Sequence, residues 1–240
     1  MAGYHEYLEL DQLLSLQRTR TKHTATELPF IVVHQVSELW FKLIIEDIQG
    51  AVEALGASDV DTALLRLRRV HEVERLLIDQ FVLIDQLPPG GFGALRLVLG
   101  TASAAESRQF AVIERISSRP PGAPATDQAE DLWSALCAQV RSDGHDMPVD
   151  DTAEARARRE RTLLEIYRQA GPTFALCEAL LDHDQAFCIW RQRHALAAAR
   201  QIGDAPGTLG TAGVTYLEQR ISRRFYPDLW SIRPDLQFSG

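Results

Sequence analysis

The sequence predicts an all-α protein, a helical bundle built from long antiparallel helices. Apolar residues recur at helical spacing along most of the 240 residues, and no stretch shows sustained alternation of apolar and polar residues. Hydrophobic residues make up 45% of the chain and charged residues 24%, which is ordinary for a globular protein. A chain of this length can bury one large core, so we expect a single domain spanning residues 1–240.

Two helices are predicted before the first clear break. Residues 6–17 place apolar side chains at helical spacing. A second helix begins near Thr24, because Thr24 and Glu27 have the spacing of a capping box. It continues through an apolar run and ends at Gly56, a residue type that commonly follows the last turn of a helix.

Proline and glycine divide the rest of the chain. Ser58 can cap a third helix, which stops before the Pro-Pro-Gly-Gly run at 88–91. Residues 119–152 look like a variable excursion, because two loops and one short helix cannot bury a core of their own. Further helices are expected around Trp133, over 152–202 with a break at Gly171-Pro172, and at about 214–224 after a Gly-rich loop at 203–213.

Charge and cysteine content disfavour several classes of protein. The formal net charge is -8, which disfavours binding to nucleic acid or to anionic membranes. The N-terminal segment lacks the basic start and apolar core of a signal peptide, and we expect no apolar stretch long enough to span a bilayer. Cys177 and Cys188 would lie about three turns apart on one helix, too far to bridge. Free thiols indicate a reducing compartment, so we expect a cytoplasmic protein.

Two histidines are candidates for chemistry. His34 lies on an apolar helix face with Phe30 one turn before it, where a histidine can be a satisfied core residue or a ligand-facing group. His194 is followed by an alanine-rich run, Ala195-Leu196-Ala197-Ala198-Ala199. Small side chains would let a flat macrocycle lie close to the helix, although the same alanines are also simply good helix formers. Neither histidine belongs to an H-E-x-x-H motif, which disfavours a zinc site.

The loop GDAPGTLGTAG at 203–213 matches no phosphate-binding motif. It fits neither the P-loop pattern nor G-x-G-x-x-G, and no strand precedes it. Its backbone amides and hydroxyls can fold over the edge of a ligand, or the loop can be a flexible surface linker.

Four ordered blocks resemble the tryptophan 2,3-dioxygenase family. The most recognisable is HQVSELWFK at 34–42, which FIVV precedes. The other blocks are YHEYLELDQLLSLQ at 4–17, FGALRLVLGTASAAESRQF at 92–110, and WRQRHALAAARQIGDAPGTLGTAGVTYL at 190–217 with YPDLWSIRPDL at 226–236. Together they cover most of the chain outside residues 119–152.

The resemblance implies a homotetrameric enzyme with a b-type heme. Such an enzyme opens the indole ring of tryptophan between C2 and C3 with dioxygen and yields N-formylkynurenine. The resemblance also implies that His194 is the proximal iron ligand and that His34 is the catalytic distal residue, which hydrogen-bonds the indole N–H. The implied substrate-binding residues are Phe30 and Phe92 against the indole, Arg96 on the carboxylate, Thr208 on the ammonium, Ser103 on the upper loop, and Tyr4, Tyr7 and Leu8 from a neighbouring subunit.

The chemistry of these residue types agrees with the implied roles. Neutral imidazole suits ferrous heme and leaves the sixth position open for dioxygen. A planar guanidinium binds a carboxylate through two parallel hydrogen bonds, although an arginine such as Arg96 is commonly a surface ion-pair partner. Tyr4, Tyr7 and Leu8 can equally form an N-terminal packing stripe.

The chain departs from the family pattern near the substrate. The family usually reads Ser-Gly-Phe-Gln-Ser where this chain has SAAES at 103–107, and the loop near Asp204 lacks the basic residue usually seen before its glycine. Ser103 and Glu106 keep the spacing of a capping box, so a helix is expected to start there. Ala105 in place of a phenylalanine leaves room that either a neighbour or a substituent on the substrate can fill.

These departures leave the substrate and the number of inserted oxygen atoms open. One alternative is a heme-dependent monooxygenase acting on a modified tryptophan in secondary metabolism. Another is a non-enzymatic binder of heme or tryptophan. The presence of both His34 and Arg96 argues against that binder, because merely holding heme needs neither residue.

Overall fold

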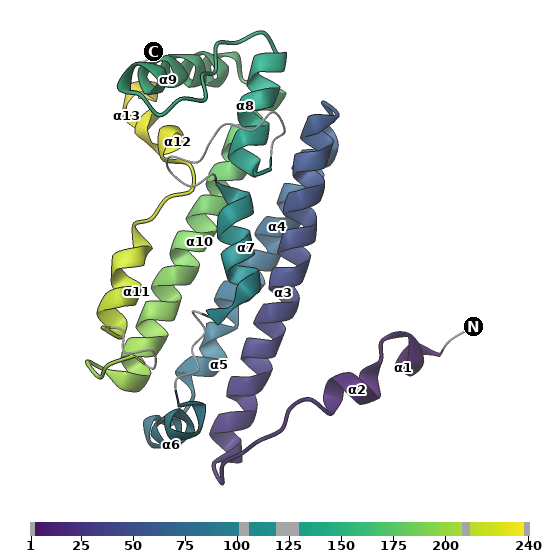
Figure 1. Cartoon of the computed structure of the whole chain (residues 1–240), viewed down its shortest axis with the longest axis vertical. Helices are drawn as coiled ribbons and strands as arrows, with labels where there is room; N and C mark the ends of the chain where they lie inside the picture. Colours follow the sequence, from purple (N-terminus) through teal and green to yellow (C-terminus); the bar gives the residue numbers. More distant parts are fainter. Residues whose placement is uncertain (1–2, 101–105, 119–129, 208–211, 238–240) are drawn as a thin grey trace.

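The computed structural model describes residues 3–100, 106–118, 130–207 and 212–237. Within these ranges every regular element is a helix, which confirms the all-α prediction. Figure 1 shows an elongated bundle of long helices with short helices at its ends. In chain order the helices are α1 Tyr4–Tyr7, α2 Leu10–Leu14, α3 Thr24–Gly56, α4 Val60–Asp79, α5 Phe81–Asp85, α6 Pro89–Leu99, α7 Arg108–Ser117, α8 Leu132–Ser142, α9 Ala153–Gln169, α10 Pro172–Ile202, α11 Val214–Ile221, α12 Pro227–Ser231 and α13 Arg233–Leu236.

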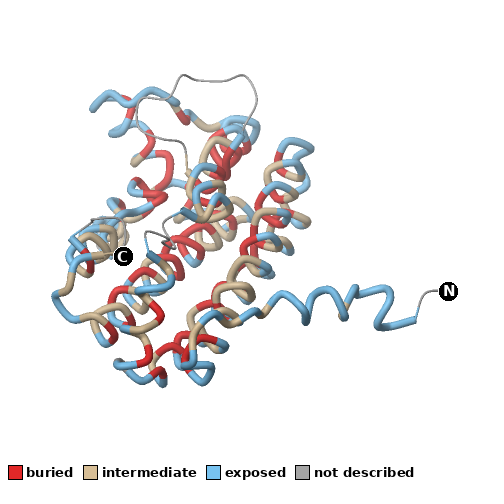
Figure 2. Tube along the Cα trace, turned by 60° about the horizontal axis from the view of Figure 1, so that its bottom comes forward, coloured by how far each residue is buried: buried red, intermediate tan, exposed pale blue. Residues whose placement is uncertain are grey.

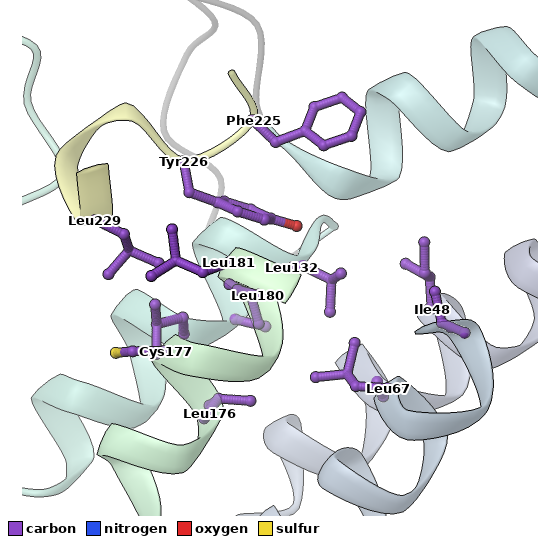
Figure 3. Packing of buried hydrophobic residues seen from close by; sticks show 14 of the residues in the cluster. Ile48, Leu67, Leu132, Leu176, Cys177, Leu180, Leu181, Phe225, Tyr226 and Leu229 are labelled. Atoms are coloured by element: carbon purple, nitrogen blue, oxygen red, sulfur yellow. The ribbon is translucent and has the colours of Figure 1, made fainter. Parts of the chain in front are cut away.

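The main core lies where α3, α4 and α10 pack together. Helix α4 contacts both α3 and α10, while α7 and α8 lie against α3. Figure 3 shows Ile48 and Leu67 from this region, with Leu180 of α10 and Tyr226 of the segment before α12. These four side chains are almost completely buried. Each buried aliphatic side chain contributes roughly 1.5–3 kcal/mol, so the packed faces of the three long helices hold the bundle together.

Helix α3 begins differently from the predicted capping box. His23 precedes its first turn, and no side chain caps that turn. The Glu27 carboxylate instead accepts hydrogen bonds from the backbone N–H groups of Arg20 and Thr21, both at 2.7 Å. The carboxylate therefore fixes the direction in which the preceding segment enters α3. The predicted end of the helix at Gly56 is confirmed.

Two further predicted caps are wrong by a few residues. Asp59, not Ser58, caps α4 by accepting from the Thr62 N–H at 3.0 Å. Ser58 itself has φ 57°, a left-handed conformation that a helix cap does not use. Helix α7 starts after Ser107, whose hydroxyl accepts from the Phe110 N–H at 3.1 Å. The helix therefore begins one turn later than a cap at Ser103 would place it.

The N-terminal segment is not the continuous helix predicted over 6–17. Glu9 has φ 50° and separates α1 from α2. These two helices contact each other and no other helix of the described ranges. The segment projects from the bundle in Figure 1 and is coloured as exposed over most of its length in Figure 2, with Tyr4 73% and Tyr7 80% exposed. Without a partner surface a helix this short is only marginally stable, which explains the interruption.

Part of the predicted excursion at 119–152 belongs to the main body. Helix α8 buries Leu132, Leu136 and Val140 in the main core. The expected break between the late helices is present, because α9 ends at Gln169 and α10 begins at Pro172.

Helix α3 is long and apolar enough to cross a membrane, by length and composition alone. This differs from the expectation that no apolar stretch reaches such a length. A core helix passes the same test, and α3 buries Phe41, Ile44 and Ile48 against its neighbours. It also buries the Asp47 carboxylate, which two arginines of α4 bind.

The three cysteines are free, as predicted. Cys137 and Cys177 are buried, and Cys188 is half-buried on α10. No pair among them forms a disulfide.

The first prediction concerns the pH dependence of the Glu27 contact. Burial raises the pKa of Glu27, but hydrogen bonds from Arg20 and Thr21 outweigh burial, so the pKa lies below its usual value. A carboxyl whose pKa is lower in the folded state adds stability above its unfolded pKa, and this stability is lost as the pH falls through the folded value. We expect Glu27→Gln to lower the free energy of unfolding by about 1–2 kcal/mol near neutral pH, because one strong acceptor is lost.

The difference in free energy of unfolding between Glu27→Gln and wild type should shrink as the pH falls below about 4, where the wild-type carboxyl becomes protonated. Urea unfolding at neutral and acidic pH measures both values. Glu53→Gln, on an exposed position of the same helix, is the control and should change the free energy by less than about 0.5 kcal/mol. An effect of Glu27→Gln that is the same at both pH values would contradict the prediction.

Candidate functional site

A second apolar cluster meets the main core at Trp190, and we call it the site cluster. Helices α3, α5 and α10 contribute to it, and α6 contacts both α3 and α10 nearby. Its buried members are Val33, Phe81, Ile84, Leu87 and Ala197, with Phe30 and Trp190 packed at its edge. The two histidines singled out in the sequence border this cluster, one on α3 and the other on α10.

His34 presents a neutral imidazole from α3. Its Nδ1–H donates to the Phe30 carbonyl oxygen at 2.7 Å, so in the neutral ring Nε2 is left as an acceptor. Burial lowers the pKa of His34, and the Phe30 carbonyl and Glu38 only partly oppose that effect. The rings of Phe30 and His34 lie 4.0 Å apart between centroids. His34 can therefore accept a hydrogen bond from an N–H group that packs against Phe30.

His194 presents a second neutral imidazole from α10. Burial is the main cause that lowers its pKa to about 4, and the charge of His34 contributes to that lowering. The two histidines border the same site cluster from different helices, His34 through Phe30 and His194 through Phe81. Phe81 stacks on His194 with centroids 6.1 Å apart, and Trp190 lies 5.4 Å away. Neutral imidazole is the form that binds a metal.

The surroundings of His194 fit a metal whose other ligands belong to a flat cofactor. Ala197 is buried and Ala198 half-buried, so in the turn that follows His194 this face of α10 carries only methyl groups. The walls contributed by Phe81 and Ile84 are apolar. Among the described residues, no group of three or more histidine, cysteine or acidic side chains is placed to hold a bare ion. One neutral nitrogen donor in an apolar setting suits a porphyrin iron.

Helix α6 brings Phe92 and Arg96 to the site. Gly91 lies directly against the Thr26 side chain, and a Cβ at this glycine would overlap the Thr26 hydroxyl oxygen. Glycine therefore lets α6 pack on the first turn of α3. The Phe92 ring then meets Phe30 edge-on, with centroids 5.9 Å apart. One turn later, the half-buried Arg96 donates from Nη2 to the Pro206 carbonyl oxygen at 2.5 Å.

Arg96 thus links α6 to the described start of the Gly-rich loop. No ion pair joins it to a carboxylate within the described parts of the chain. A guanidinium has five N–H donors, so the bond to Pro206 leaves donors for a carboxylate.

Several residues that hold the site together were not singled out in the sequence. Gln201 donates to the Ile84 and Leu87 carbonyl oxygens at 3.0 and 3.2 Å, and Arg193 pairs with Asp85 at 2.8 Å. These contacts hold α10 against α5 on either side of His194. The only local signal was that Gln201 lies about two turns after His194 on the same helix face.

The structure brings together His34, His194, Phe30 and Phe92 and places Arg96 beside them. Ser103 and Thr208 lie outside the described residues. Three other predicted residues, Tyr4, Tyr7 and Leu8, are exposed on the N-terminal arm and do not reach the site of their own chain.

Comparisons with known proteins are consistent with this arrangement. The family model described as tryptophan 2,3-dioxygenase matches residues 1–118 and 125–236. The tryptophan 2,3-dioxygenase of Anaeromyxobacter sp. (strain K) is 36% identical over 251 residues, which cover 96% of this chain and 94% of that relative. Those of Herpetosiphon aurantiacus and Caulobacter vibrioides are 34% and 33% identical and cover 97% of this chain and 98% of each relative. The chain is therefore an enzyme that belongs to the tryptophan 2,3-dioxygenase family.

Proposed function

We propose that this enzyme uses a b-type heme held by His194 to cleave the indole C2–C3 bond of L-tryptophan or a close derivative with dioxygen. The product would be of the N-formylkynurenine type. The observation that carries the proposal is the pair of neutral imidazoles, His34 and His194, that border the site cluster from α3 and α10. Family membership and the names of the relatives support oxidation of tryptophan.

When bound, the heme would supply the iron at which dioxygen is activated. His194 holds the iron, since burial keeps its imidazole unprotonated. Phe81 and Trp190 fix the orientation of that imidazole by ring contacts. The neighbouring alanines leave space for a flat ring beside α10.

The other residues bind and orient the substrate. His34 Nε2 accepts the indole N–H, because its Nδ1–H is already committed to the Phe30 carbonyl. Phe30 and Phe92 pack against the indole and exclude water from it. Arg96 binds the substrate carboxylate with the donors that Pro206 leaves free. Ser103 and Thr208 keep their proposed roles on the upper loop and at the ammonium group.

We further propose that the enzyme is a homotetramer in which Tyr4, Tyr7 and Leu8 complete the pocket of a neighbouring subunit. The exposure of these side chains and the lack of helix contacts from the arm to its own bundle support this assignment. A cytoplasmic location, with no nucleic-acid or membrane partner, fits the net charge of -8 and the free cysteines.

The alternative is a heme-dependent monooxygenase acting on a modified tryptophan. The departure at Ala105 favours a modified substrate, because alanine is smaller than the usual phenylalanine and leaves room for a substituent; this residue lies outside the described ranges. Mass spectrometry of the product formed by reduced protein, dioxygen and L-tryptophan separates the two functions. Two added oxygen atoms support the dioxygenase, and one added atom supports the monooxygenase. The same assay with methylated and ring-substituted tryptophans tests the substrate. Conversion of these compounds alone places the substrate among derivatives.

The second prediction concerns His194. His194→Ala should abolish stable heme binding, since the described site offers no second unprotonated imidazole one turn away on α10. The Soret band of the purified wild type should be missing from the variant. His145→Ala, in the loop after α8, is the matched control and should keep the band. A variant at position 194 with a full heme spectrum would overturn the assignment.

The third prediction concerns Arg96. Removing one partner of a buried charge pair costs roughly 2–5 kcal/mol, so Arg96→Ala should strongly reduce kcat/KM for L-tryptophan. Turnover of 3-methylindole, which has no carboxylate, should fall far less. Arg75→Ala, exposed on α4, controls for loss of an arginine. Equal losses of activity toward L-tryptophan and toward 3-methylindole would assign Arg96 a structural role.

The fourth prediction concerns the N-terminal arm. Deleting residues 1–10 should lower kcat/KM for L-tryptophan and leave the heme spectrum near normal, because these residues are exposed in their own chain. Mixed oligomers sharpen the test. Subunits with an intact arm and His194→Ala should restore activity to arm-deleted subunits that keep their heme. Full activity of the deleted protein alone would remove the arm from the site.

A further inference from the structure

One carboxylate of α7 binds three arginines that come from other segments. Glu114 accepts hydrogen bonds from Arg191 of α10 at 3.3 Å, from Arg220 of α11 at 3.0 and 3.1 Å, and from Arg223 at 3.3 Å. Its side chain is 15% exposed, so the contacts are partly shielded from water. Removing this carboxylate would leave guanidinium charges uncompensated in partly buried surroundings.

Arg191 is the most deeply buried member of this group, with 4% of its side chain exposed. Its Nη1 donates to the Arg223 carbonyl oxygen at 2.9 Å, and its guanidinium lies over the Phe225 ring at 5.0 Å. Its Nε is buried without a hydrogen-bond partner among the described residues. Burial lowers the pKa of Arg191, and the charge of Glu114 opposes that change. The buried guanidinium therefore depends on Glu114 for its ion pair.

The three segments joined by Glu114 all lead to the site. Helix α7 begins after Ser107, at the end of the segment that follows α6. Helix α11 begins after Gly213, at the end of the Gly-rich loop. Arg191 precedes His194 by three residues on α10. Glu114 thus ties the helices that follow both loops of the site to the helix that holds His194.

A series of contacts joins α11 to Arg96 through the base of the Gly-rich loop, where the two ends of the loop at 203–213 meet. Gly213 has φ 59°, and a Cβ at this position would lie 2.6 Å from the Ala205 carbonyl oxygen. The two ends of the loop are therefore packed together, which places the start of α11 against the segment that contains Pro206. The Pro206 carbonyl is the group that Arg96 binds.

We propose that Glu114 is a positioning residue for the amino-acid end of the substrate. It acts through Arg191 and Arg220 on the base of the Gly-rich loop and on Arg96, and it touches neither substrate nor cofactor. The proposal rests on the proposed function, in which Arg96 binds the substrate carboxylate. Glu114 differs from a merely structural ion-pair partner because the arginines that it binds belong to the segments that lead to the site.

The chain offers a matched control for this proposal. Asp47 on α3 is also a buried carboxylate bound by two arginines, Arg66 and Arg69 of α4. It lies about 20 Å along α3 from His34, by the rise of an α-helix, and its partners lead to neither loop. Asp47→Asn should therefore lower stability without changing how the amino-acid end of the substrate is bound.

The first measurement needs no substrate. Hydrogen exchange of the peptide covering residues 203–213 should be about 3- to 30-fold faster in Glu114→Gln holoenzyme than in wild type, as expected for a modest coupling energy. Asp47→Asn should leave exchange of this peptide unchanged, even where its melting temperature falls as much. Glu114→Asp, which keeps the charge, should exchange at a rate between wild type and Glu114→Gln.

The second measurement compares two substrates. In Glu114→Gln, KM for L-tryptophan should rise about tenfold with a smaller change in kcat, since loss of orientation at a binding group acts mainly on binding. KM for 3-methylindole, which has no amino-acid end, should stay near the wild-type value. Glu114→Asp should recover much of the affinity for L-tryptophan.

Unchanged exchange of residues 203–213 in Glu114→Gln would overturn the proposal. Equal rises of KM for both compounds, or the same pattern in Asp47→Asn, would also overturn it and make Glu114 a structural residue. If wild type converts neither L-tryptophan nor a methylated or ring-substituted tryptophan, the proposed function fails instead, and hydrogen exchange alone still decides whether Glu114 positions the loop.

Discussion

The site depends on two imidazoles that border one apolar cluster from different helices. A protonated imidazole there would lose its hydration, and two of them would repel each other. Both rings are therefore held neutral, with the pKa of His194 lowered to about 4. Neutrality gives His194 a free lone pair for a metal and His34 a free lone pair for an N–H donor. The neutral state of both imidazoles thus serves both proposed roles, which are binding of the iron by His194 and acceptance of the indole N–H by His34.

The main core positions the helices that surround the site cluster, and Trp190 packs against both groups of residues. The packed faces of α3, α4 and α10 bury most of the large aliphatic side chains, so they fix the spacing between the helices that carry the histidines. The site cluster itself has few buried members. Directional contacts supplement its packing, since Gln201 and Arg193 bind α10 to α5 on either side of His194. Packing against α4 sets the distance between α3 and α10. The bonds made by Gln201 and Arg193 set the position of α10 along α5.

The sequence predicted what depends on local spacing and missed what depends on contacts across the chain. Helical periodicity located the long helices, the local sequence singled out His34 and His194, and the resemblance added Phe92 and the roles proposed for these residues. Caps were misplaced at Ser58 and Ser103 because nearby Asp and Ser residues compete for the same role, and only the three-dimensional turn decides. The continuous helix at 6–17 was wrong because it assumed a packing partner. Bonds such as Arg96 to Pro206 join residues 110 positions apart, which no local pattern reveals.

Recognition of the amino-acid end of the substrate is the step at which these long-range contacts matter most. In the proposed function Arg96 binds the substrate carboxylate while it stays bonded to the Pro206 carbonyl, and its planar fork has enough donors for both. Pro206 is packed near the base of α11 through Gly213, and α11 is bound by Glu114 to α10. The group that orients the carboxylate is therefore connected to the helix that carries His194. An indole without an amino-acid end would make no use of this connection, so the same contacts that fix the geometry of the site also favour substrates that carry a carboxylate.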